Sequence, residues 1–261
     1  MNMFTLSKHQ ICNILRGLIA AFLAMSSSAL ADVTPQSNQH AKRISICAAQ
    51  GHPIHMMAAD TIAEAYRRIG YTVDFNWLPN KRSLKSANLG MCGGEMMRIK
   101  GIHAQFPALT PVMVPVTILE GVAFMNMNEA EPSSVISTWE DLSSLKTYII
   151  LGEVYAEQGT KGMDVESVKN YAQMFKILAR DVHGVGIGIR EIGLLEIAKN
   201  HPDSEIRINS APLAQLPMYH YIHQSHAHIV PQLQETLRAM YETGEIQKLN
   251  QDAMAQMLAK P

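Results

Sequence analysis

The chain has 261 residues, of which 47% are hydrophobic and 17% charged, with 22 lysine and arginine residues against 23 aspartate and glutamate residues. This composition is typical of a soluble globular protein. The excess of acidic residues, which grows to three once the predicted leader is removed, argues against nucleic acid or an anionic membrane surface as a partner.

The first 31 residues read as a signal peptide. Lys8 and Arg16 give a positive segment before an apolar run at 17–25, which is too short to span a bilayer. The small residues that end at Ala31 supply an A-x-A cleavage site. We predict cleavage after Ala31, a periplasmic location without membrane insertion, and a disordered polar segment at 32–42. The leader carries two of the 22 basic residues and no acidic one, which leaves 20 against 23 and a net charge of −3.

The first part of the mature chain alternates strand and helix patterns. Its elements are predicted as a strand at 43–49, an amphipathic helix at 53–69, an alternating strand at 71–77, a short helix at 80–89 and a strand at 91–99. This β-α-β-α-β order predicts a parallel sheet with helices on its faces.

A second set of elements follows. We predict an apolar run at 114–127, a helix N-terminus at 137–142, strands at 146–151, 182–189 and 205–208, helices at 165–179 and 192–199, and a closing helix from about 230 that ends at Gly244. The pattern contains no internal repeat.

Two cysteines remain after the leader is removed, Cys47 and Cys92. An even pair in an exported protein suggests one disulfide. Two buried, unbonded thiols are the alternative, since cysteine is also a common core residue.

Four histidines lie in the stretch YHYIHQSHAHIV at 219–230. In a helix His226 and His228 would point about 200° apart, and the stretch contains no Asp, Glu or Cys that could complete a metal site. Pro231 fits best near a helix start. We therefore predict an extended segment at 219–222, a helix beginning between Ser225 and Pro231, and solvated imidazoles, with a metal site as the alternative.

Motifs for nucleotide binding and catalysis are missing from the sequence. The segment GVGIGIREIG at 184–193 lacks the third glycine of a dinucleotide loop, GEVYAEQGTK at 152–161 is not a P-loop, and neither G-x-S-x-G nor H-E-x-x-H occurs. We predict no cofactor, no metal and no enzyme activity.

Several motifs occur together in a fixed order: LPNKRSL at 78–84, ANLG at 87–90, GEMMRIKG at 94–101, WEDL at 139–142 and YIHQSHAHIVP at 221–231. Over about 43–250 the chain thereby resembles the family 3 extracellular solute-binding proteins. The resemblance implies an α/β, two-lobed type II periplasmic-binding fold, in which each lobe is a mostly parallel sheet flanked by helices and two crossover strands join the lobes. Lobe 1 would comprise 43–118 and 213–261, and lobe 2 the inserted 119–212.

In such a fold the ligand binds in the cleft between the lobes, beyond the carboxyl ends of the strands. That rule selects nine candidate ligand-binding residues: Gln50, His52, Trp77, Arg82, Glu95, Arg98, Glu153, Tyr155 and Arg190. Arg82 and Arg98 could clamp a carboxylate through two parallel hydrogen bonds, although each could instead form an ordinary surface ion pair. Trp77 or Tyr155 could cover an apolar part of the ligand.

The resemblance implies a monomeric periplasmic solute-binding protein. We expect it to capture a small, carboxylate-bearing solute, either amino-acid-like or an organic acid, for an ABC-type permease. One alternative is a sensor that signals to a membrane kinase or cyclase. The other is a dehydratase-like enzyme, for which Glu95 with His52 or Glu153 would have to supply the acid and base.

Overall fold

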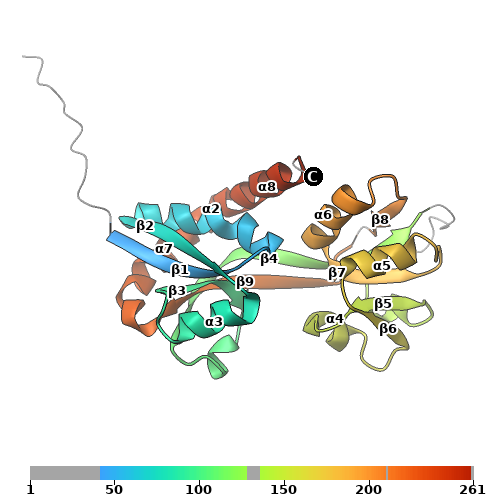
Figure 1. The fold of residues 1–261 in the computed structure, drawn as a ribbon, viewed down its shortest axis with the longest axis horizontal. Helices are drawn as coiled ribbons and strands as arrows, with labels where there is room; N and C mark the ends of the chain where they lie inside the picture. The colour runs from blue at the N-terminus through green and yellow to red at the C-terminus, as the bar shows by residue number, and fades with distance from the viewer. Residues whose placement is uncertain (1–41, 128–135, 210, 260–261) are drawn as a thin grey trace, which may run out of the picture. The chain divides into compact units, whose positions relative to one another are not determined.

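The computed structural model describes residues 42–127, 136–209 and 211–259 (Figure 1). The predicted signal peptide, its cleavage site and nearly all of the predicted disordered segment at 32–42 lie outside these residues. Within the described ranges, none of the helices combines the length and the apolar character needed to cross a membrane.

The described strands form a single sheet in the order β2-β1-β3-β9-β4-β7-β5-β6, with β8 beside β4 (Figure 1). The strands are β1 (Lys42–Ala49), β2 (Tyr71–Leu78), β3 (Gly94–Ile99), β4 (Leu109–Asn126), β5 (Thr147–Ile150), β6 (Val165–Val168), β7 (Val185–Ile189), β8 (Ile206–Ile208) and β9 (Ala214–His223). The helices are α2 (Pro53–Arg68), α3 (Asn80–Asn88), α4 (Val154–Gly159), α5 (Tyr171–Leu178), α6 (Arg190–Asn200), α7 (Val230–Glu242) and α8 (Glu245–Leu258).

The long strand β4 runs through both halves of this sheet. It pairs antiparallel with β9 from Leu109 to Gly121 and then with β7 from Gly121 to Met125. We call the part around β1, β2 and β3 the first half, and the part around β5, β6 and β7 the second half. β4 and β9 are therefore the two strands that cross between the halves (Figure 1).

The carboxyl ends of the two sets of strands face each other along β4. β1, β2 and β3 are parallel to one another. Because β9 is antiparallel to both β3 and β4, these three strands run in the same direction as β4. β7 is antiparallel to β4, so β7 and its parallel neighbours β5 and β6 run in the opposite direction. Ile99, the last residue of β3, pairs with Met218 of β9, and Met218 pairs in turn with Thr117 of β4. Ile189, the last residue of β7, pairs with Gly121 of β4. Four residues of strand correspond to about 13 Å. The sheet thus brings both sets of strand ends to the middle of β4.

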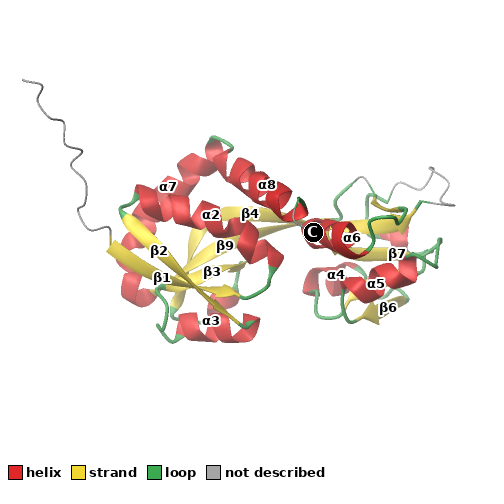
Figure 2. Ribbon diagram, turned by 45° about the horizontal axis from the view of Figure 1, so that its top comes forward, coloured by secondary structure: helices red, strands yellow, loops and turns green. Residues whose placement is uncertain are grey.

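Helices cover both faces of the sheet, as the predicted β-α-β order requires. In the first half α2, α7 and α8 pack together on one face, and α3 lies on the other (Figure 2). In the second half, alternate residues of β4 separate two clusters: Ala123 packs with Ala156 of α4, and Phe124 with Phe175 of α5. This alternation places α4 and α5 on opposite faces of the sheet.

The structure joins Cys47 of β1 to Cys92, which shortly precedes β3 in the chain, by a disulfide. Both residues are almost fully buried, and Asn76 of β2 contacts the Cys92 sulfur. The bond therefore ties the first three strands together near one end of the sheet.

One predicted helix is wrong in its limits, and one helix was not predicted. Residues 165–168 form β6, which pairs in parallel with β5, and the helix begins only at Tyr171 because the side chain of Asn170 caps it by accepting a hydrogen bond from Gln173 N (2.9 Å). The closing helix does end near Gly244, but that residue has a positive φ of 76° and a further helix, α8, begins immediately after it.

Gly94 permits close packing of β3 against β9, because a Cβ atom there would lie 2.3 Å from the carbonyl oxygen of Tyr221. We expect Gly94→Ala to lower the free energy of unfolding by about 3 kcal/mol, the upper range for overpacking, since a backbone atom is the obstacle. Urea denaturation measures the change. Gly152→Ala is the matched control: its φ is 87°, but a Cβ atom there would meet no described atom within 4 Å, so only backbone strain of about 1 kcal/mol applies. Equal losses in the two variants would contradict the packing argument.

Candidate functional site

Glu95 and Arg98 form a buried ion pair at the end of β3. Glu95 is 0% exposed, and its carboxylate accepts hydrogen bonds from Ser83 Oγ (2.6 Å) and Arg98 Nε (2.9 Å). Burial raises the pKa of Glu95, and the charge of Arg98 opposes that rise. Arg98 also donates from Nη1 and Nη2 to Asn80.

These contacts engage four of the five N–H groups of the Arg98 guanidinium, since Nη2 also donates to Glu95. One N–H on Nη1 remains. The carboxylate clamp predicted from the sequence needs two free N–H groups, so Arg98 in this arrangement cannot form it. The contacts of Arg98 with Glu95 and Asn80 instead hold β3 and α3 in position.

Two neutral histidines lie at the start of α2, beside this ion pair. The ring of His52 meets that of His55 edge-on at 5.3 Å, and His55 Nδ1 accepts a hydrogen bond from Ala49 N (3.2 Å). Burial, together with the charge of Arg98, lowers the pKa of His55 to about 2 and also lowers the pKa of His52. His52 Nδ1 is buried and has no hydrogen-bond partner among the described residues.

In the second half, Glu153 and Tyr155 lie at the start of α4. The Tyr171 hydroxyl donates to Glu153 Oε1 (2.7 Å) and accepts from Ile189 N (2.6 Å). Burial raises the pKa of both Glu153 and Tyr155. The ring of Tyr155 lies over Gly121 of β4, where a Cβ atom would come within 2.4 Å of it. Glycine at 121 thus makes room for the tyrosine.

The other predicted residues have different surroundings. Gln50 and Arg82 are exposed, and the Arg82 side chain makes no hydrogen bond or ion pair with any residue that the structure describes. Trp77 is 37% exposed and lies 5.9 Å from the ring of Phe75. Arg190 donates from Nε to Glu120 Oε2 (2.6 Å) and faces a separate cavity.

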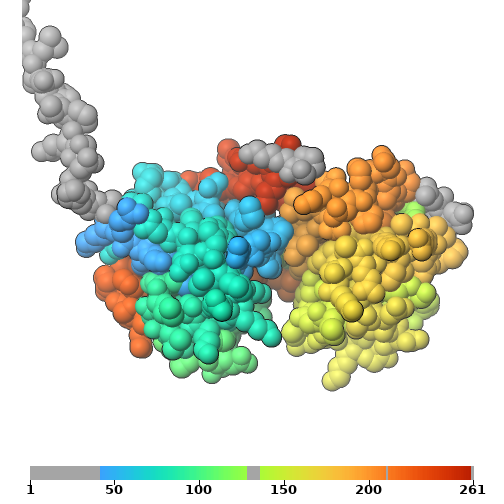
Figure 3. Space-filling view, viewed as in Figure 1, coloured from blue at the N-terminus to red at the C-terminus, as the bar shows by residue number. Residues whose placement is uncertain are grey.

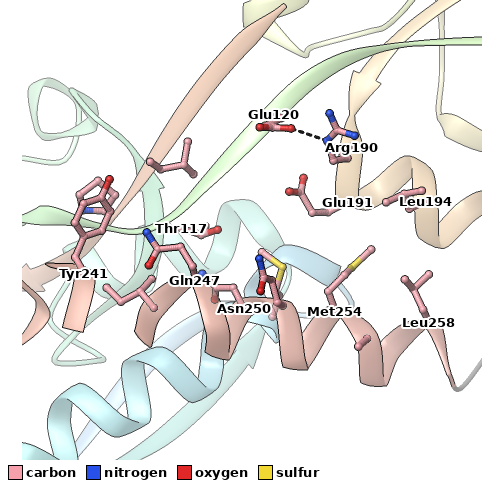
Figure 4. Close-up of a pocket in the computed structure, with 16 residues that line it drawn as sticks. Thr117, Glu120, Arg190, Glu191, Leu194, Tyr241, Gln247, Asn250, Met254 and Leu258 are labelled. Carbon is pink, nitrogen blue, oxygen red and sulfur yellow. Dashed lines mark hydrogen bonds and ion pairs between the residues drawn. The ribbon is translucent and has the colours of Figure 1, made fainter. Parts of the chain in front are cut away.

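That cavity has a volume of about 540 Å³ and lies between α8, α6 and β4 (Figure 4). None of the candidate residues other than Arg190 lines it. No sequence pattern indicated the cavity, because α8 itself was not predicted.

Four buried side-chain polar atoms lack a hydrogen-bond partner within the described part of the chain: His52 Nδ1, Glu153 Oε2, Tyr155 Oη and Glu191 Oε2. Such an atom costs about 1–3 kcal/mol, so each one needs an explanation. The first three belong to residues that shortly follow β1 and β5, at the strand ends that face each other. A groove is visible between the teal surface of α3 and the yellow-green surface of α4 (Figure 3).

His55, Tyr171 and Glu191 were missed by the sequence analysis. His55 follows His52 by one helical turn, which is a usable signal, whereas Tyr171 was interpreted only as part of an apolar helix face. Glu191 directly follows the predicted Arg190, and both side chains line the cavity beside α8 (Figure 4).

The histidines of 219–230 do not form a metal site in the structure. No group of three or more metal-ligating side chains occurs in residues 42–127, 136–209 and 211–259. The prediction of solvated imidazoles is wrong for His220, which is 0% exposed: its Nδ1 donates to Met96 O and its Nε2 accepts from the Tyr66 hydroxyl, each at 2.9 Å. His228 is exposed, and the chain does change from β9 to a helix at this point, as predicted.

Comparisons with known proteins agree on the fold. No protein-family model matches the chain. An uncharacterized protein of Shewanella oneidensis is 25% identical over 255 residues, covering 94% of this chain and 95% of that protein. Among solved structures, the L-cystine solute receptor of Neisseria gonorrhoeae has a TM-score of 0.65 at 13% identity and covers 83% of this chain and 94% of its own.

Two further structures are similar over the same extent. An ancestral arginine-binding protein bound to arginine has a TM-score of 0.58 at 14% identity, covering 80% of this chain and 97% of its own. A histidine kinase sensor domain with similarity to periplasmic binding proteins has a TM-score of 0.59 at 15% identity, covering 82% and 97%. The chain therefore has the two-lobed α/β fold of the periplasmic binding proteins, and the predicted fold class is confirmed.

Proposed function

We propose that the chain is a periplasmic solute-binding protein of the family 3 type, which holds a small solute between its two lobes. Lobe 1 would comprise 43–118 and 213–261, and lobe 2 would comprise 119–212. The observation that carries this proposal is the convergence of two sets of strand carboxyl ends on the middle of β4, with three buried polar atoms, on His52, Glu153 and Tyr155, that lack partners among the described residues. A bound solute would supply the missing partners.

The polar groups favour an amino-acid-like solute over a dicarboxylic acid. Among the described residues Glu153 has no cation as a hydrogen-bond partner. The hydroxyl groups of Tyr171 and Tyr155 lie beside its carboxylate and lower its pKa against the effect of burial, but Oε2 accepts no hydrogen bond of normal length there, which favours a solute with a donor such as an ammonium group. A second carboxylate placed there would repel Glu153. Arg82, which is exposed on α3 and unpaired within the described chain, is our candidate for binding the carboxylate of the solute, and Trp77 is our candidate for covering its apolar part.

Delivery of the solute to an ABC-type permease is the proposed use of this binding. A sensory role is the second candidate, because a histidine kinase sensor domain shares the fold. The dehydratase-like alternative has less support. Glu95, its first acid–base candidate, is fully buried and already bound by Ser83 and Arg98, so it is poorly placed to exchange protons with a substrate.

A thermal-shift screen of the common amino acids, dicarboxylates and short peptides tests this proposal. A solute present at 100 times its Kd adds about 2.7 kcal/mol to the free energy of unfolding. For a chain of this size that corresponds to a rise in Tm of about 5–10 °C. We expect at least one amino acid to produce such a rise and the dicarboxylates to produce none. A response to dicarboxylates alone would contradict the assignment of Glu153, and no response to any compound would contradict the proposed class of solute.

A further inference from the structure

The cavity beside α8 is separate from the groove at the strand ends. We call it the α8 cavity; its lining includes the charged residues Glu120, Arg190 and Glu191 and the apolar residues Leu194, Met254 and Leu258. Glu120 and Gly121 are neighbours on β4, so the side chain of Glu120 and the Cα hydrogen of Gly121 that takes the place of a side chain point to opposite faces of the sheet. Tyr155 covers Gly121, while Glu120 faces the cavity. The α8 cavity thus lies on the opposite face of β4 from the ring of Tyr155. Its lining includes neither Tyr155 nor Glu153, although Glu191 is close enough to the Tyr155 hydroxyl to raise its pKa.

One side of the α8 cavity carries three charged groups. Arg190 is paired with Glu120, and the carboxylate of Glu191 lies next to them with its buried Oε2 unpartnered within the described residues. Figure 4 shows the three side chains together where β4 passes the start of α6, across the cavity from α8. Two carboxylates and one guanidinium leave one negative charge in excess, because no other described residue of the lining is charged.

The rest of the wall is mainly apolar, with Leu194, Met254, Leu258 and Met57 among its members. Asn250 also lines the cavity, but its amide is already engaged: Oδ1 accepts from Thr61 Oγ (3.2 Å) and Nδ2 donates to Val116 O (2.9 Å). Glu191 is therefore the group best placed to bind a charged ligand, and the adjoining wall is suited to a hydrocarbon body.

We propose that the α8 cavity is a second binding site, which takes a small organic cation with an ammonium group on Glu191 and an apolar body between α6 and α8. A volume of about 540 Å³ lies within the range of small-molecule sites. An ammonium donor satisfies the unpartnered oxygen of Glu191 and neutralises the excess charge.

Three probes of equal length test the proposal on the purified protein: hexylammonium, hexanol and hexanoate, each titrated by ligand-observed NMR. We expect hexylammonium to bind at one saturable site at least tenfold more tightly than hexanol, and hexanoate not to bind. Equal affinity for the three probes, or no saturable binding of hexylammonium at millimolar concentration, would overturn the proposal.

Variants locate the bound amine. Ala255 is an exposed residue at the cavity wall, so Ala255→Trp fills the cavity without disturbing the core and is expected to abolish binding, whereas Ala255→Ser should retain it. Glu191→Gln is expected to reduce the affinity for hexylammonium to that for hexanol. If Glu153→Gln abolished amine binding while Ala255→Trp retained it, the amine would be a ligand of the groove, and the second site would be rejected. That result would leave the proposed solute-binding function intact.

Discussion

Arg98→Ala is expected to lower the free energy of unfolding by about 3–5 kcal/mol, because it leaves the carboxylate of Glu95 buried without its cation. Urea denaturation at pH 7 measures this change. The double variant Glu95→Gln with Arg98→Met should recover more than half of the loss, since it removes both charges while keeping similar side-chain volumes.

The matched control is Arg43→Ala, which breaks a bidentate pair with Asp74 at the exposed edge of β1 and β2. Both side chains are largely exposed, so the expected loss is small and much less than that of Arg98→Ala. If Arg98→Ala were as mild as Arg43→Ala and abolished solute binding, Arg98 would be a ligand clamp after all, and its assignment as a positioning residue would be wrong.

Acid is expected to destabilise the protein through two buried histidines. Burial lowers the pKa of His220 to about 4 and that of His55 to about 2, whereas an unfolded histidine titrates near 6.5. As the pH falls below about 6.5, the unfolded chain takes up protons that the folded chain excludes. This part of the stability is therefore fully present well above that pH and declines as the pH falls, by about 2 kcal/mol per histidine between pH 6.5 and 4.5.

The structural reason is clearest for His220. Its Nδ1 donates to Met96 O, and its Nε2 must stay unprotonated to accept from the Tyr66 hydroxyl. His220→Gln should be less stable than the parent at pH 7 but should lose about 2 kcal/mol less between pH 6.5 and 4.5. Chemical denaturation at the two pH values gives the difference. His228→Gln, at an exposed histidine, controls for the loss of an imidazole, and identical pH dependence in His220→Gln and the parent would contradict the account.

Much of the fold could be predicted from periodicity. The alternation of Tyr71, Val73 and Phe75 and the helical spacing after Pro53 identified β2 and α2, and their order implied a parallel sheet. Helix α8 was missed although Ile246, Asn250 and Ala253 have helical spacing and are buried. Gly244 was interpreted as the end of the pattern, whereas its positive φ allows the chain to turn into a further helix.

The strand-end rule located four groups of the candidate site, His52, Glu153, Tyr155 and the Glu95–Arg98 pair, but not their roles. Residues three apart on a regular strand point to opposite faces. The register of β3 against β9 shifts between Glu95 and Arg98, and this irregularity allows their side chains to meet. No sequence pattern indicates such a bulge, so Arg98 was predicted as a ligand clamp or a surface ion pair, and the buried pair with Glu95 was not foreseen.

Glu153 is proposed to face a solute held between the two sets of strand ends. Isothermal titration of the amino acid with the largest thermal shift tests it most directly, using the parent, Glu153→Gln and Glu166→Gln. Glu166 lies exposed on the edge strand β6 and is the matched control. We predict that Glu153→Gln weakens binding about 100-fold, because a buried charge-assisted bond is lost, and that Glu166→Gln binds like the parent. An unchanged Kd in Glu153→Gln would contradict the account.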